Sequence, residues 1–173
     1  MVIQVQATIN FYPEEKTRKH IAQGVWKRHA LIETNCDIEL YYAWFLKKRF
    51  NLKLNKTLRG THISFIADRC ESKNWEEVAK KYHGKSITFY HELEPRTQGE
   101  HWWLRVYSPH AGDIREELGL SREPFHPLHL TLGYATIKNI EHSFYIMETC
   151  KRFNLVDLSP RKSLSEHEIL KFI

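Results

Sequence analysis

The chain has 173 residues, of which 42% are hydrophobic and 13% aromatic, so it is long and apolar enough to build a packed core. Its formal net charge of +5 favours anionic partners such as nucleotides or RNA. Basic and acidic residues are mixed along the chain, which argues against the dense basic stripe of a typical nucleic-acid-binding domain. The three cysteines form no Cys-x-x-Cys, which argues against a disulfide framework and a thiolate zinc site.

The first residues lack a basic segment followed by an apolar stretch, so no signal peptide is predicted. The longest apolar run, at 40–46, is too short to span a membrane. We therefore expect one domain over residues 1–173, with no membrane contact. We expect it in the cytoplasm, which would be the host cytoplasm for a viral or phage protein. The sequence leaves the oligomeric state open.

In the first half of the chain, alternating Val and Gln predict a strand over 2–9. Pro13 and the two glutamates after it favour a helix start, and we expect this helix to reach about His29. Residues 37–50 repeat apolar side chains at helical spacing and end on a basic run that suits the carboxyl end of a helix. We expect the aromatic residues of that helix to belong to the core. A second strand is predicted over 60–68.

In the second half, Asn74 as a cap and Gly84 as a stop predict a short helix over 75–82. Residues 85–93 and 101–108 alternate as strands do, on either side of a turn-rich segment, and predict a hairpin. The remaining expected elements are a helix at 111–118, a strand within 124–135 and a helix at 140–153.

Two short motifs carry most of the functional information: His62-Ile63-Ser64 and His129-Leu130-Thr131. In each, a histidine and a hydroxyl lie two residues apart in a strand, so both side chains point to one face. Composition alone predicts about one such match in the chain, so the number of matches is weak evidence for function. The stronger evidence is that both motifs lie in strand-like segments with alternating apolar residues around them. The alternative for either motif is an ordinary strand histidine whose hydrogen bonds are satisfied by the core.

These two motifs resemble the hallmark of the 2H (two-histidine) phosphoesterase superfamily, which includes cyclic phosphodiesterases and 2′,5′-oligonucleotide phosphodiesterases. Some of its viral and phage members destroy nucleotide defence signals. Serine stands in the first motif where threonine is common, and the hydroxyl is kept. The resemblance implies an α+β, bilobal fold, with two antiparallel β-sheets that form a concave central groove and helices packed outside. Each of the two pseudo-symmetric lobes would contribute one motif to the groove.

The chemistry that these residues permit is acid–base cleavage of a phosphodiester. One neutral imidazole accepts a proton from the nucleophile, and a protonated imidazole donates one to the leaving oxygen. Ser64 and Thr131 would donate hydrogen bonds to phosphate oxygens. We expect no metal and no cofactor, because no His-Glu-x-x-His motif is present and Pro127 disfavours a helix that would aim His126 and His129 at one ion. A serine-nucleophile triad is disfavoured because no Gly-x-Ser-x-Gly occurs.

Candidate substrate-binding residues come from one strand face and two flanking positions. Trp103, Arg105 and Tyr107 share a face, and they combine aromatic surface with a guanidinium that suits a base and a phosphate. Tyr12 could stack on a base, and Arg59 could pair with phosphate. The alternative for the strand residues is a solvent-exposed mixed face.

Together with the resemblance, these features predict a metal-independent phosphodiesterase that hydrolyses a nucleotide or short oligonucleotide. The bond cleaved would be a 2′,3′-cyclic phosphate, a 2′,5′ linkage or a phosphodiester of a cyclic oligonucleotide. Such an enzyme could counteract nucleotide-based antiviral defence. The alternatives are a non-catalytic RNA- or nucleotide-binding module that uses the same groove, and a structural protein in which both histidines belong to the core.

Overall fold

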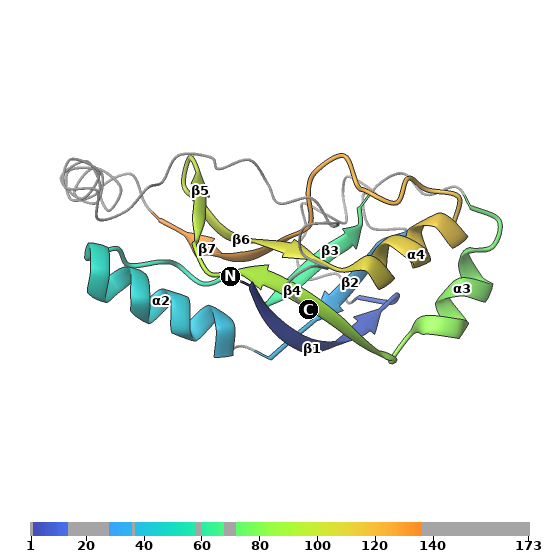
Figure 1. The fold of residues 1–173 in the computed structure, drawn as a ribbon, viewed down its shortest axis with the longest axis horizontal. Helices are drawn as coiled ribbons and strands as arrows, with labels where there is room; N and C mark the ends of the chain where they lie inside the picture. The colour runs from blue at the N-terminus through green and yellow to red at the C-terminus, as the bar shows by residue number, and fades with distance from the viewer. Residues whose placement is uncertain (1, 14–27, 36, 58–59, 68–71, 136–173) are drawn as a thin grey trace.

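The computed structural model describes residues 2–13, 28–35, 37–57, 60–67 and 72–135. Within these residues the protein has an α+β fold (Figure 1). The strands are β1 (Val2–Asn10), β2 (Ala30–Glu33), β3 (His62–Ile66), β4 (Ser86–Glu92), β5 (Arg96–Gln98), β6 (His101–Tyr107) and β7 (His129–Tyr134). The described helices are α2 (Asp37–Phe50), α3 (Trp75–Tyr82) and α4 (Pro109–Glu117).

All strand pairs are antiparallel, and they form one sheet in the order β4-β1-β2-β3-β7-β6-β5. An additional pairing of β4 with β6 closes this sheet into a barrel. The expectation of two separate sheets therefore does not describe the strand pairing. Two short seams join what would otherwise be two sheets: β3 meets β7 at one residue pair, Ile63 with Leu130, and β4 meets β6 at two.

Alternation gives the sheet one buried apolar face and one half-exposed polar face. Along most of β3, β6 and β7 every second side chain is buried, and the alternation stops near the end of each strand, where two successive residues are buried. The buried face contributes Ala7, Ile9, Ile63, Phe65, Ile87, Phe89, Leu104, Leu130 and Leu132 to the hydrophobic core. Because opposite side chains in an antiparallel pair lie on the same face, burial of these residues places their polar neighbours together on the other face.

The helices cover the ends and flanks of the strands (Figure 1). Helix α2 lies against β7, and α4 lies against β4. Helix α4 begins two residues before the predicted start, with Pro109 in its first turn and the Ser108 hydroxyl accepting a hydrogen bond from the Ala111 amide at 3.4 Å. Helix α3 follows Asn74, but the side chain of Asn74 makes no capping hydrogen bond, so this part of the capping prediction was wrong.

The predicted elements within the described residues are confirmed to within five residues at their ends. The hairpin predicted from 85–93 and 101–108 is only partly correct, because the expected turn contains β5, which pairs with β6, whereas β4 meets β6 at two residue pairs. The helix expected to reach His29 falls mostly outside the described residues, and at its described end Arg28 and His29 lead directly into β2. The helix expected at 140–153 lies outside them altogether. In α2, Tyr42 and Leu46 are buried as expected, whereas Tyr41 is 55% exposed and belongs to the outer face.

Candidate active site

The two motifs lie on adjacent strands and on the same face of the sheet. His62 and Ser64 come from β3, and His129 and Thr131 come from β7. The two strands pair at Ile63 and Leu130, and both of these side chains are fully buried. Continuing this antiparallel register by one residue each way sets His62 beside Thr131 and Ser64 beside His129. Each histidine thus neighbours the hydroxyl of the other motif.

The two histidine rings are held in the same way. The Nδ1 of His62 lies 2.9 Å from the Gly60 carbonyl, and the Nδ1 of His129 lies 2.9 Å from the Pro127 carbonyl, in each case two residues earlier. A carbonyl oxygen only accepts, so Nδ1 is the donor in both bonds. This fixes the tautomer, so that in the neutral imidazole Nε2 is the ring nitrogen without a proton. Gly60 supplies the positive φ of +84° that the turn before His62 requires.

Strand β6 extends the same face on the far side of His129. Arg105 pairs with His129 and Trp103 pairs with Thr131 in the register of β6 and β7. The indole of Trp103 contacts the His129 ring edge-to-face, with centroids 5.8 Å apart. The Nε atom of Arg105 is buried and has no hydrogen-bond partner among the described residues. A buried guanidinium nitrogen without a partner is costly, and an anionic ligand would satisfy it.

Tyr107 supports this arginine rather than offering a free stacking surface. The guanidinium of Arg105 lies 5.5 Å from the centroid of the Tyr107 ring, and the Tyr107 hydroxyl donates to Glu92. Burial, followed by this hydrogen bond, raises the pKa of Tyr107 well above its usual value, so the phenol stays neutral. Glu92 also accepts from Arg96 at 2.6 Å, and Arg96 in turn lies over Trp103.

A β-bulge shapes the strand that carries the first motif. Leu31 pairs with Ser64 but Ala30 pairs with Ile66, so Phe65 is the extra residue. The carbonyl of this extra residue accepts a hydrogen bond of 2.7 Å from the guanidinium of Arg115 in α4, a side chain that is only 2% exposed. The same guanidinium donates to the Ser121 carbonyl at 2.8 Å. Arg115 therefore ties β3 to the loop that leads into the second motif.

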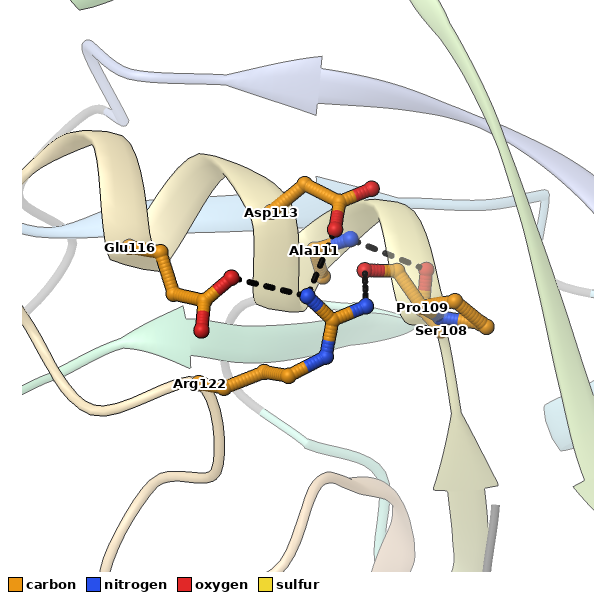
Figure 2. A network of polar contacts seen from close by, with 6 residues as sticks. All are labelled: Ser108, Pro109, Ala111, Asp113, Glu116 and Arg122. Atoms are coloured by element: carbon orange, nitrogen blue, oxygen red, sulfur yellow. Dashed lines mark hydrogen bonds and ion pairs between the residues drawn. The ribbon is translucent and has the colours of Figure 1, made fainter. Parts of the chain in front are cut away.

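A second arginine holds that loop on α4 from outside. Figure 2 shows Arg122 reaching back to the helix, where it donates to Asp113 at 2.6 Å and to Glu116 at 2.8 Å. It also donates to the Pro109 carbonyl at 3.3 Å, next to the Ser108 cap (Figure 2). The loop of residues 118–128, which leads to His129, is therefore anchored to α4 near its start.

Of the other two expected substrate-binding residues, Tyr12 lies away from the motifs and Arg59 is outside the described residues. Tyr12 contacts α3 and the turn after it: its ring lies edge-to-face on His83 with centroids 5.0 Å apart, and its hydroxyl donates to Glu76 at 3.3 Å. The residues described here give it no contact with either motif. Arg59 lies outside the described residues, so its role stays a prediction.

Sequence reasoning missed two residues that lie next to the motifs. His29, just before β2, places its Nε2 3.3 Å from the Ser64 hydroxyl and is 4% exposed. Glu33 pairs with His62 across β2 and β3 and accepts a hydrogen bond from Asn10. The available signal was the apolar run 30–32, which is short enough for a buried strand.

Among the described residues, no group of three or more His, Cys, Asp or Glu side chains is placed to hold a metal ion. None of the described helices is long and apolar enough to cross a membrane. Comparisons with protein-family models, with curated proteins and with solved structures each gave no match. The functional argument therefore rests on the residues and their geometry.

Proposed function

We propose that this protein is a metal-independent phosphodiesterase of the two-histidine type, acting on a nucleotide or short oligonucleotide. The observation that carries the proposal is the matched pair of motifs on adjacent strands, where both histidines donate through Nδ1 to a carbonyl two residues earlier. An ordinary pair of core histidines has no reason to share this arrangement. The half-exposed polar face around them would serve as the substrate groove, with β4, β1, β2 and β3 on one side and β7, β6 and β5 on the other.

The reaction that fits this geometry is in-line displacement at phosphorus. One imidazole takes the proton from water or a ribose hydroxyl through Nε2 as the new P–O bond forms. The other imidazole, protonated beforehand, gives its proton to the leaving oxygen as the old P–O bond breaks. Acid–base assistance of this kind contributes roughly 10²–10⁴-fold for a positioned group. Hydroxyl protons of Ser64 and Thr131 would stabilise the charge on the non-bridging oxygens.

Arg105 supports an anionic substrate at this site. It lies opposite His129, its Nε is buried, and its guanidinium forms no ion pair within the described part of the chain, in contrast to Arg96, which is paired with Glu92. A guanidinium can bind two phosphate oxygens at once, which a lysine ammonium cannot. Trp103, between Arg96 and His129, offers the aromatic surface on which a base of the substrate would stack.

The test is turnover by the full chain against a panel of 2′,3′-cyclic nucleotides, 2′,5′-linked oligoadenylates and cyclic dinucleotides, with a chelator present. His62→Ala and His129→Ala should each lower kcat by about 100-fold or more. His110→Ala is the matched control, because His110 is exposed on α4 and contacts Tyr82, away from the motifs.

Arg105→Lys separates substrate binding from chemistry. It keeps the positive charge but loses the planar fork, so KM should rise by more than kcat falls. If wild-type protein turns over no member of the panel but binds one tightly, and the binding depends on Arg105, the protein is a nucleotide-binding module. If His62→Ala and His110→Ala retain equal activity, the proposed catalytic role of the motifs is wrong.

A further inference from the structure

His29 is a third histidine at the site, and no motif contains it. Its ring is almost fully buried, and its Nε2 lies 3.3 Å from the Ser64 hydroxyl. We infer that His29 is a positioning residue that turns the proton of the Ser64 hydroxyl toward the phosphate of the substrate. The inference rests on the proposed function and adds a residue to it.

His29 contacts Ser64 next to the bulge in β3. Leu31 lies directly opposite Ser64, and His29 shares its face two residues earlier along the chain. The extra residue, Phe65, shifts the pairing between Ala30 and Leu31 and increases the local twist of the strand pair. Bulges commonly redirect side chains next to active sites. Here the bulge lies directly beside the contact between the buried His29 imidazole and the Ser64 hydroxyl.

Arg115 holds this bulge in place. An extra residue in a ladder leaves a backbone carbonyl without its usual partner, and a buried carbonyl without a partner is costly. Arg115 donates to the Phe65 carbonyl at 2.7 Å. A buried arginine that donates to the bulge carbonyl indicates that the bulge is a built feature, since a regular strand would need no such donor.

The direction of the hydrogen bond decides what His29 does. A serine hydroxyl has one proton and two acceptor lone pairs. If Ser64 donates to His29, the proton is used and none remains for substrate. If His29 donates through Nε2, the Ser64 oxygen accepts and its own proton is left to bind a phosphate oxygen. An anionic phosphate at the site favours the second arrangement, because it stabilises a hydroxyl proton directed at it.

The second motif hydroxyl offers an internal comparison. Thr131 lies next to Trp103 across β6 and β7, and Trp103 presents an aromatic ring rather than a buried imidazole. The side chain of Thr131 has no hydrogen bond corresponding to that between His29 and Ser64 among the described residues. The inference therefore assigns a fixed direction to one hydroxyl proton and leaves the other to be set by substrate.

The experiment is a double-mutant cycle between positions 29 and 64 in the full-length chain. His29→Phe keeps the ring volume and removes the donor, and His29→Gln keeps an N–H donor. Each is made in wild type and in Ser64→Ala, and kcat, KM and the affinity for inorganic phosphate are measured well below the melting temperature. His29→Phe should lower kcat by about five- to tenfold in wild type, and His29→Gln should recover part of the loss.

In the Ser64→Ala background, His29→Phe should change kcat by less than about twofold, because the hydroxyl through which it acts is gone. If His29 had a purely structural role, His29→Phe would lower kcat by the same factor in both backgrounds, and that result would overturn the inference. Failure of the proposed function is a different outcome: wild type then turns over no substrate. In that case the double-mutant cycle is evaluated from the affinity for inorganic phosphate. The role of His29 is rejected if His29→Phe changes this affinity equally in both backgrounds, or if wild type does not bind phosphate.

Discussion

Replacing Arg115, which is buried in α4, should lower the free energy of unfolding far more than replacing Arg122, which is exposed in the loop after α4. Arg115→Met removes the donors to the Phe65 and Ser121 carbonyls while keeping an unbranched apolar side chain. Hydrogen bonds from charged groups contribute about 1.5–3 kcal/mol each, and both carbonyls would lose this donor within the fold. The loss in unfolding free energy should therefore be about 3–6 kcal/mol, a large part of the 5–15 kcal/mol that is typical of a domain.

Arg122→Met is the matched control, since it makes the same substitution seven residues later on the surface. Arg122 pairs with Asp113 and Glu116, but its side chain is 36% exposed, and exposed pairs contribute less than about 1 kcal/mol. Urea unfolding measures both variants: with an m-value near 2 kcal/mol per molar, Arg115→Met should lower the midpoint by roughly 2 M. Equal losses for the two variants would refute the reasoning that burial gives Arg115 its importance.

Four further substitutions test the fold and the site. Gly133→Ala should cost more than about 1 kcal/mol in urea unfolding, because a Cβ there would lie 2.5 Å from the Asn55 carbonyl oxygen and φ is +146°. His91→Phe should reduce the loss of melting temperature between pH 7 and pH 5.5: burial lowers the pKa of His91, so the unfolded ring protonates first and stability falls as pH drops below about 6.5. Ile63→Val and Ile87→Val should each cost about 0.5–1.5 kcal/mol, since both side chains are buried, but only Ile63→Val, at the seam between the motifs, should change kcat.

Each of these has a result that contradicts it. A stable Gly133→Ala would mean that β7 does not approach Asn55 so closely. An unchanged pH dependence in His91→Phe would mean that another group controls acid stability. If Ile87→Val altered kcat as much as Ile63→Val, then the seam would have no special effect on the motifs.

Local patterns were enough to predict the motifs and most elements. The alternation that predicted strands around His62 and His129 is the same alternation that the structure shows as buried and half-exposed faces. It is visible in the sequence because burial imposes a period of two on every strand of this kind. It also predicted that Trp103 and Arg105 would share a face, which the pairing of β6 with β7 confirms.

What could not be predicted depends on contacts between distant segments. The closure of the sheet through β4 and β6 is a pairing of tertiary structure that leaves no local signal. Arg115 lies in a charged helical segment, which predicts a surface residue. It is nevertheless buried, and it donates a hydrogen bond to the Phe65 carbonyl at the bulge. Tyr12 looked available for stacking because its contact with His83 joins residues far apart in sequence.

The register that forms the candidate site is determined by the core behind it. A slip of one residue between β3 and β7 would turn His129 and Thr131 to the core face and expose Leu130 and Leu132. Exposing two fully buried leucines would cost about 3–6 kcal/mol, and burying an imidazole without a partner would cost more. Since a single residue pair joins these strands, backbone pairing contributes little to choosing between the registers. The apolar residues between the polar ones make that choice, so the side chains that face the core set the distance between the side chains proposed for catalysis.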